Sequence, residues 1–186
     1  NSGKIKEIKF YLEYFNLFAG FKIIDLSNYT GLGEPIENGS TFEENSIIKS
    51  TFFFHKTNCL TLSDDSGFTV DEMDNFPGTK TARVAKEMGG EQQVINFIFK
   101  KNPNKHKISA TFHCCLSLVG HNVNQAVTGR VNGFIISNKK GNEGFGYDPF
   151  FIPSRSKKTF AEMGLKEKMN LSHRFEAFKI LSTIQK

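Results

Sequence analysis

Two long runs of strand-forming residues, 108–119 and 126–137, constrain the fold of this chain most. A polar turn around His121-Asn122 separates the runs, so they predict a β-hairpin with two long arms. Helix-like and strand-like segments alternate before this hairpin, and a helix-like segment follows it. We therefore expect an α/β fold in which helices flank a mixed, twisted β-sheet. At 186 residues the chain is long enough for one such domain.

The remaining elements follow from hydrophobic periodicity and from turn and capping residues. Residues 4–17 predict an amphipathic helix, and Phe21 to Leu26 predict a strand. Residues 27–40 predict a loop. The other expected elements are a helix from Ser40 or Thr41 to about Lys56, short strands at 60–62 and 68–70, one or two helices over 79–101, a glycine-rich loop over 138–149, and a last helix capped by Ser172 that buries Phe175, Phe178, Leu181 and Ile184.

Composition narrows the class of protein. The formal net charge is +5 with a pI near 9.1, which fits either a solvated lysine-rich surface or an anionic ligand. No apolar run approaches the roughly 18 residues of a membrane span. Three cysteines, two of them adjacent as Cys114-Cys115, predict neither a disulfide framework nor a zinc site. We expect a cytoplasmic protein, with the cysteines beside His113 acting as small apolar residues of a half-buried strand.

The most informative short motif is Asp64-Asp65-Ser66-Gly67, which we expect at the end of an apolar strand. Strand ends are where α/β proteins place chemistry. Two adjacent carboxylates repel each other, and a divalent ion such as Mg²⁺ would relieve that repulsion while binding substrate phosphates. The alternative is a turn that simply favours Asp and Gly.

Three further segments are suggestive in the same way. Asn1-Ser2-Gly3-Lys4 precedes a predicted helix and could bind a phosphate, or it is only a flexible segment. Gly144 to Pro149 offers Phe145 and Tyr147 as flat faces for a base and Asp148 as an acceptor, or it is a turn whose aromatics pack on the core. Lys168 and Ser172-His173-Arg174 put cationic donors at a helix start, or they belong to a capped surface helix.

Taken together, these segments resemble the inosine/xanthosine triphosphate pyrophosphatase family. The resemblance covers the chain from end to end as a single domain, residues 1–186, although segment 89–107 matches poorly and relatives have a short strand before the position of Asn1. The matching segments are NSGKIKEI (1–8), ENGSTFEENSIIK (37–49), SDDSG (63–67), FPGTKTAR (76–83), ATFHC (110–114), GFGYDPFF (144–151) and EKMNLSHR (167–174).

The resemblance implies two lobes around a nucleotide-binding cleft, a homodimer, and Mg²⁺-dependent hydrolysis of ITP, dITP and XTP to the monophosphate and pyrophosphate. Asp65 matches the general base, and Glu37 and Asp65 match the metal ligands, with Asp64 close by. The phosphate- and sugar-facing positions correspond to Asn1, Ser2, Gly3, Lys4, Lys49, Ser66 and Lys168. The base pocket corresponds to Phe145, Gly146, Tyr147, Asp148, His173 and Arg174.

Two other functions stay open at this point. A nucleotide-binding protein that has lost catalysis would keep the same fold, although Glu37, Asp64, Asp65 and Asp148 are all present. A basic module that binds nucleic acid would exploit the high pI, but the lysines are dispersed along the chain instead of clustered. We expect a small-molecule nucleotide partner, with no nucleic acid and no membrane.

Overall fold

The computed structural model describes residues 2–185 and is built on a five-stranded sheet of order β2-β1-β3-β4-β5. Strands β3 (Ile108–Gly120) and β4 (Val123–Ile135) form the predicted hairpin, which turns at residues 121–122. All four strand pairings are antiparallel, so the α/β class is confirmed but the expectation of a mixed sheet is wrong. The β3–β4 pair is joined by a two-residue turn and can pair only in this way.

Strand β1 (Thr61–Val70) runs without interruption through the acidic motif. It pairs with β3 from Thr61 to Thr69, so Asp64 to Gly67 lie inside a strand. The sequence had suggested that they lie at the end of a strand, and that expectation is wrong. On its other side, β2 (Phe76–Pro77) pairs only with Thr69 and Val70. Within residues 2–185, β1 is therefore an edge strand along its acidic stretch, and successive side chains point to opposite faces.

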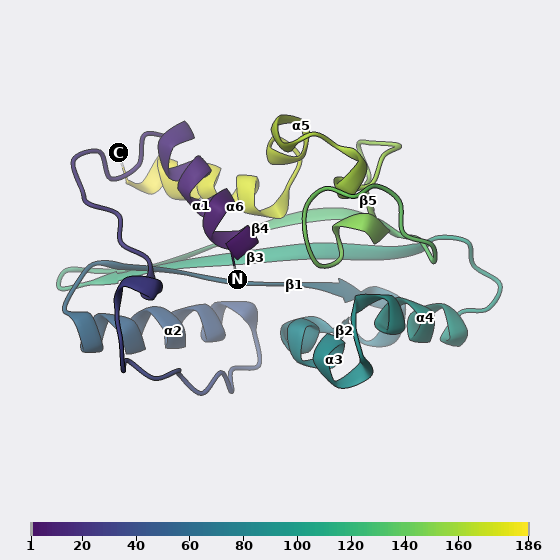
Figure 1. Ribbon diagram of the computed structural model, residues 1–186, viewed down its shortest axis with the longest axis horizontal. Coiled ribbons are helices and arrows are strands. Elements are labelled where there is room, and N and C mark those ends of the chain that lie inside the picture. The colour runs from purple at the N-terminus through teal and green to yellow at the C-terminus, as the bar shows by residue number, and fades with distance from the viewer. Residues whose placement is uncertain (1, 186) are drawn as a thin grey trace.

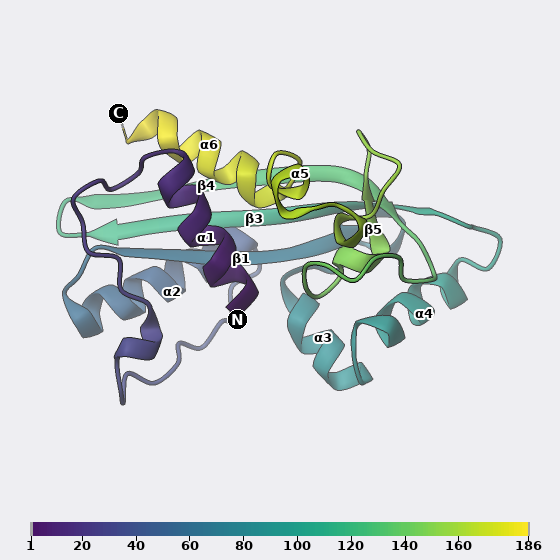
Figure 2. The same cartoon turned by 45° about the horizontal axis from the view of Figure 1, so that its top comes forward.

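Helices cover both faces of the sheet (Figures 1 and 2). On one face lie α1 (Ser2–Tyr14), α5 (Leu165–Met169) and α6 (His173–Ile184). On the other lie α2 (Phe42–Thr57), α3 (Thr81–Met88) and α4 (Glu91–Lys101). The short strand β5 (Phe151–Pro153) extends the sheet beyond β4.

Helix α2 begins as predicted, because Thr41 and Glu44 form a capping box. Its buried face is small and polar, with Asn45, Ser46 and Ser50 against the sheet. The Ser50 Oγ lies 2.8 Å from the Ser117 Oγ on β3, and the Ser63 Oγ donates to the Ser46 carbonyl at 2.6 Å. These hydroxyl contacts bring α2 close to β1 and β3.

Periodicity predicts an apolar stripe on α1, and most of it packs on the core, with Leu12 buried and Ile8 and Phe15 partly buried. Its buried residues are Glu7, Tyr11 and Leu12, whereas Ile5 is only half-buried. The segment that follows was predicted as a strand, but Phe21 to Asp25 have no strand partner among the described residues. The apolar side chains of Phe21, Ile23 and Ile24 are exposed. A strand needs a neighbour to bind its backbone groups, and this segment has none there.

The predicted helical region 79–101 forms two helices, because Gly89 and Gly90 both adopt positive φ angles and end α3. Residues 78–80, 71–73, 26–28, 148–150 and 160–162 form short 3₁₀ turns. Helix α6 begins at its Ser172 cap, as predicted. It buries Phe178 and Leu181, but Phe175 is half-buried and Ile184 is 47% exposed, contrary to expectation.

Two apolar cores hold the layers together. One packs α3 and α4 and the 147–163 region around Phe68, Ile95 and Phe112, and the other packs α1 and α6 around Tyr11, Leu116 and Phe178. Both Cys114 and Cys115 are buried in the sheet, consistent with their prediction as small apolar residues. In the described part of the chain, no helix is both long and apolar enough to cross a membrane.

Candidate active site

A cavity of about 470 Å³ opens beside the acidic stretch of β1, a volume suited to a small-molecule ligand. Its wall combines the start of α1, the middle of β1, the junction of α3 and α4, the loop at 144–148, and the region where α5 leads into α6. The predicted site residues that line it are Lys4, Ser66, Phe145, Gly146, Tyr147, Asp148, Lys168, His173 and Arg174.

Asp64 is the centre of a buried ion-pair network on the α1 and α6 face. Its Oδ1 accepts from Lys4 at 2.6 Å and from the Ser66 hydroxyl at 2.7 Å. Its Oδ2 accepts from the Arg174 Nε at 2.8 Å and from the Cys114 thiol at 3.1 Å. Burial opposes ionisation, but Arg174 and Lys4 outweigh it and hold the pKa of this carboxyl well below its usual range. Asp64 is therefore a fixed anion with all its acceptor positions engaged.

Glu7 completes this network, and the sequence analysis did not single it out. It is 4% exposed, its Oε1 accepts from Lys168 at 2.6 Å, and its Oε2 accepts from the Arg174 guanidinium. Lys168 also donates to Asp148 at 2.6 Å. The one sequence signal was position: Glu7 lies four residues before Tyr11, which places it on the same buried face of α1.

Asp65 faces α2, on the opposite side of β1. Its Oδ1 accepts from Lys49 at 2.6 Å, and the same ammonium donates to Glu37 at 3.1 Å. The Oδ2 of Asp65 is buried and has no hydrogen-bond partner within residues 2–185. Burial raises the pKa of the Asp65 carboxyl, and Lys49 offsets only part of that effect. Asp65 therefore has an unpartnered carboxylate oxygen, which Asp64 lacks.

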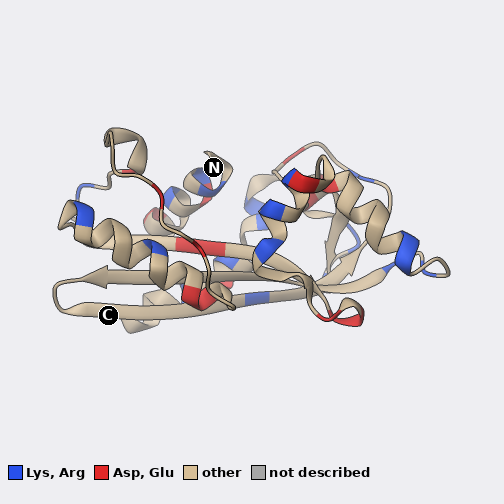
Figure 3. Ribbon diagram, turned by 90° about the horizontal axis from the view of Figure 1, so that it is seen from below, with Lys and Arg blue, Asp and Glu red and all other residues tan. Residues whose placement is uncertain are grey.

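In the view from below, the acidic stretch of β1 lies beside α2, which carries basic positions along its length (Figure 3). The two aspartates form ion pairs with different cations, Asp64 with Lys4 and Arg174, and Asp65 with Lys49. Each has its own basic partner on its own face of the strand, and Lys4 acts electrostatically on both. The predicted mutual repulsion is relieved by protein side chains.

The loop at 144–148 places Phe145 at the cavity wall. The Phe145 amide donates to the Asp148 Oδ2 at 2.8 Å, which fixes the turn. The Lys168 ammonium lies 4.8 Å from the centre of the Phe145 ring. A Cβ at Gly3 would lie 2.4 Å from that ring, so only glycine allows the start of α1 to approach it this closely.

Tyr147 lies deeper, with its ring centre 4.5 Å from that of Phe68 in the core. Its hydroxyl is buried and unpartnered in the described chain, although the residue lines the cavity. Both interpretations of the loop therefore apply to Tyr147, since its ring packs on the core and the residue also lines the cavity.

His173 stacks on Phe112, with ring centres 4.8 Å apart. Its Nδ1 is buried, with no hydrogen-bond partner among residues 2–185. Burial, followed by the charges of Arg174 and Lys168, lowers the pKa of His173 well below its usual value, so the imidazole is neutral. Helix α6 approaches β4 closely enough to place this ring because position 129 is glycine: a Cβ there would lie 2.2 Å from the His173 carbonyl.

Comparison with known proteins agrees with this architecture. The model of the Ham1 family matches residues 1–184. The chain belongs to the Ham1 family. A dITP/XTP pyrophosphatase of Bacillus subtilis is 36% identical over 187 residues, covering 99% of this chain and 92% of the relative. One of Campylobacter jejuni, with the same name, is 33% identical and covers 100% of this chain and 94% of the relative.

Solved structures give the same result. The Ham1 protein of Staphylococcus aureus has a TM-score of 0.85 at 33% identity and covers 99% of this chain and 93% of that one. A structure from Mycobacterium abscessus titled nucleoside-triphosphatase / dITP/XTP pyrophosphatase has a TM-score of 0.75 at 30% identity, covering 97% and 93%. The resemblance found in the sequence is thereby confirmed at the level of the family.

The predicted site residues of this Ham1 protein fall into two groups. The larger group lines the cavity, and the smaller one, Glu37, Lys49 and Asp65, gathers between β1 and α2. Arg174 is 1% exposed and donates to Asp64, Glu7 and Ser66, so its guanidinium is largely engaged by protein groups. Ser2 is exposed at the start of α1, and Asn1 lies outside the described residues.

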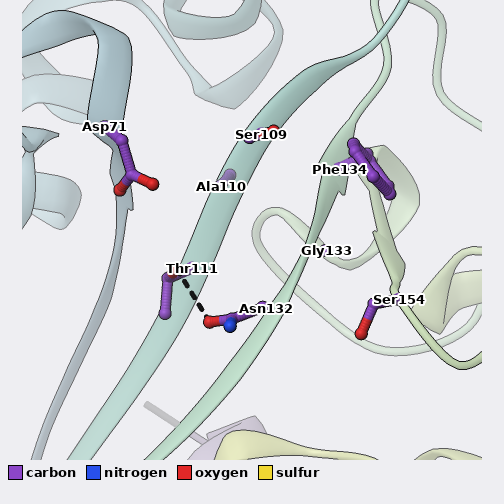
Figure 4. Close-up of a pocket in the computed structure, with 8 residues that line it drawn as sticks. All are labelled: Asp71, Ser109, Ala110, Thr111, Asn132, Gly133, Phe134 and Ser154. Carbon is purple, nitrogen blue, oxygen red and sulfur yellow. Dashed lines mark hydrogen bonds between the residues drawn. The ribbon is translucent and has the colours of Figure 1, made fainter.

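A second hollow of about 330 Å³ lies on the sheet where β3 begins and β4 ends, at the opposite end of the hairpin from its turn (Figure 4). It is lined by hydroxyl and amide groups, among them Thr111 and Asn132, which are joined by a hydrogen bond of 3.1 Å. None of the predicted site residues lines it.

Proposed function

We propose that this protein hydrolyses deaminated purine nucleoside triphosphates, namely dITP, ITP and XTP, to the nucleoside monophosphate and pyrophosphate, and so keeps them out of DNA and RNA. The observation that carries the proposal is a buried carboxylate oxygen with no partner in the described chain, at Asp65, one residue from a cavity with aromatic and polar walls. The names of the relatives in the Ham1 family support the substrate class.

Asp65 is the proposed general base. Its free Oδ2 would accept a proton from water as the water oxygen attacks the α-phosphorus. The bond between the α-phosphorus and the bridging oxygen then breaks, and pyrophosphate leaves with that oxygen. A raised carboxyl pKa strengthens Asp65 as a base, and proton abstraction of this kind contributes about 10²–10⁴-fold to a rate.

Glu37 and Asp65 are the proposed ligands of Mg²⁺. Within residues 2–185 no three His, Cys, Asp or Glu side chains gather into a metal cluster. The donor set nevertheless suits Mg²⁺, because that ion uses one or two carboxylates together with water and substrate phosphates. The ammonium held between the Asp65 Oδ1 and Glu37 indicates a position for a cation, and it leaves the Asp65 Oδ2 for the proton transfer. When bound, Mg²⁺ supplies charge neutralisation of the phosphates.

The phosphates and sugar would lie along the edge of β1. Lys4 and Lys49 face this edge from opposite sides, each within 2.6 Å of an aspartate. Backbone groups of Asn1, Ser2 and Gly3, together with Ser66 and Lys168, are the other proposed contacts. Phosphoryl transfer depends mostly on positioning and charge neutralisation, and lysines at an edge strand provide both.

The base would lie against Phe145, with Gly146, Tyr147 and Asp148 completing that wall. Hypoxanthine and xanthine have an acceptor oxygen at position 6, where adenine has a donor amino group. A neutral His173 whose Nδ1 carries the proton would donate to that oxygen and would leave a donor unpaired opposite adenine. Mismatches of this kind cost several orders of magnitude in specificity. Arg174 would act on the base mainly by fixing this wall.

The deciding experiment measures pyrophosphate release from dITP, ITP, XTP, GTP and ATP, each with and without Mg²⁺. We expect fast, Mg²⁺-dependent release from the deaminated nucleotides and slow release from ATP and GTP. Binding of dITP without turnover would instead support a catalytically silent nucleotide-binding protein. Salt-sensitive binding to RNA or DNA, without turnover, would support a nucleic-acid-binding module.

We further propose a single domain over 1–186, a homodimer and a cytoplasmic location. Helix α2 carries the half-buried apolar side chains Ile48 and Phe52 on the side away from Ser46 and Ser50, and a second copy could cover them. Light scattering of the intact protein tests the dimer, and a mass of twice 21.0 kDa is expected.

A further inference from the structure

Lys49 occupies an unusual position between two acidic side chains. Its ammonium lies 2.6 Å from the Asp65 Oδ1 and 3.1 Å from the Glu37 Oε2, and its side chain is 16% exposed. The neighbouring Ser46 and Ser50 fix α2 against the sheet, so the lysine reaches Asp65 from a helix whose position is fixed. A single positive charge is thus held at the place where two carboxylates converge.

Asp65 gives a second and independent indication of a ligand at this place. The residue is 7% exposed, yet its Oδ2 has no partner in the described part of the chain. A buried carboxylate oxygen without a partner carries a desolvation cost that a bound group would remove. The ammonium engages one oxygen of the carboxylate and leaves the other for something else.

We propose that Lys49 is an internal counter-cation that competes with the metal. In the free protein its ammonium joins Glu37 to Asp65 and preserves their arrangement. On metal binding Lys49 gives up both contacts and turns toward the substrate phosphates. The inference rests on the proposed function, since it concerns the divalent ion that this function requires.

Electrostatics explains why the two cations exclude each other. A monovalent ammonium and a divalent ion within a few Å, on the same carboxylates, repel each other strongly when partly buried. Both cations bind the same carboxylates, so the carboxylates stay in place. Lys49 has a long flexible side chain and is the group that can move away. Glu37, 41% exposed on an extended segment, is held toward Asp65 by this ammonium.

The consequence is a coupling between metal and nucleotide. Lys49 weakens metal binding in the free protein, because the ammonium must first be displaced. A triphosphate gives the displaced ammonium a new anionic partner and so removes that cost. By linkage, the nucleotide strengthens metal binding and the metal strengthens nucleotide binding by the same factor.

The test measures Mn²⁺ affinity in the absence of nucleotide, by electron paramagnetic resonance of the free ion. Mn²⁺ is the probe because it shares the oxygen-ligand preference of Mg²⁺. The variants are Lys49→Met and Lys49→Gln, and Lys56→Met is the matched control because Lys56 is an exposed residue on the same helix. We expect roughly tenfold or tighter Mn²⁺ binding in either Lys49 variant, and unchanged binding in the control.

A Mn²⁺ affinity that is unchanged or weaker in both Lys49 variants would overturn the proposal, because Lys49 would then support the carboxylates without competing for them. Pyrophosphate release from dITP by the unaltered protein is scored separately. If that release occurs while the Lys49 variants gain no Mn²⁺ affinity, only the inference fails. If the variants bind Mn²⁺ more tightly while the unaltered protein releases no pyrophosphate, only the proposed function fails.

Discussion

Asp64 and Asp65 are neighbours in the chain, yet their carboxylates lie on opposite faces of β1 and pair with different cations. Asp64 is engaged by Lys4 and Arg174 on the α1 and α6 face, and Asp65 is engaged by Lys49 on the α2 face. Because β1 is an edge strand at this point within residues 2–185, a ligand can reach both faces only around that edge. Asp64 therefore fixes the cavity wall, and Asp65 keeps one carboxylate oxygen unpartnered in the described chain, which is the oxygen proposed as the base.

Replacing the proposed base tests that division directly. Asp65→Asn keeps the shape of the side chain but removes its ability to accept a proton. We expect turnover of dITP to fall by about 10²–10⁴-fold, with nucleotide binding largely retained. Pyrophosphate release and equilibrium binding of a non-hydrolysable dITP analogue measure the two effects. Full activity in this variant would refute the role of Asp65.

Removing the aromatic face of the cavity tests the position of the base. Phe145→Ala should raise the KM for ITP, because stacking of a base on an aromatic ring contributes about 1–3 kcal/mol. Phe134→Ala serves as the control, since it removes an exposed phenyl ring on β4 that does not line this cavity. An unchanged KM in Phe145→Ala would place the base elsewhere.

Glu7 links the cavity to the stability of the whole fold. Glu7→Gln leaves Lys168 and Arg174 buried with one negative charge fewer, so we expect a loss of about 3–5 kcal/mol in the free energy of unfolding. Urea denaturation measures this loss. Lys9→Ala is the control, because it breaks an exposed ion pair with Asp25 and should leave the free energy of unfolding nearly unchanged. Equal effects in the two variants would contradict a buried role for Glu7.

Stability should fall on mild acidification because of His173. Its pKa is depressed in the folded protein, so below about pH 6.5 the unfolded chain takes up a proton that the folded chain does not. The free energy of unfolding should then decrease by about 1.4 kcal/mol per pH unit for this residue as pH falls from 6.5. Burial and the Arg130 charge lower the pKa of His113 to about 4, which adds to the loss.

Urea denaturation at pH 7.5, 6.0 and 5.0 checks this expectation. The His173→Gln variant should lose less stability across that range than the unaltered protein, while His106→Gln, at an exposed position, should follow it. Parallel curves for all three proteins would show that His173 is not kept neutral by the fold.

Local signals predicted local structure well. The capping box at Thr41 and the turn at His121-Asn122 each depend on a few neighbouring residues, and both were correct. The strand through Asp64 to Gly67 was missed because its polar residues resemble a turn. Only pairing with a distant segment, from Val119 to Thr111, makes them a strand.

The same limit applies to the site. Motifs identified the residues that line the cavity, because these are close together in the sequence within each motif. Glu7 was missed because its partners, Lys168 and Arg174, lie more than 160 residues away in the chain. An isolated glutamate on a helix usually faces water, and only the packing of α1 on α6 reverses that expectation.

The hydroxyl contacts beneath α2 limit which substitutions this protein can accept in the course of evolution. Ser46, Ser50, Ser63 and Ser117 act as a spacer of fixed thickness between helix and sheet. An added methylene in that layer would lift α2 as a unit and carry Lys49 away from Asp65. Displacements of about 1 Å far from the reacting atoms can cost a hundredfold in rate. Under the proposed function, these four small side chains would set how precisely Lys49 and Asp65 are held.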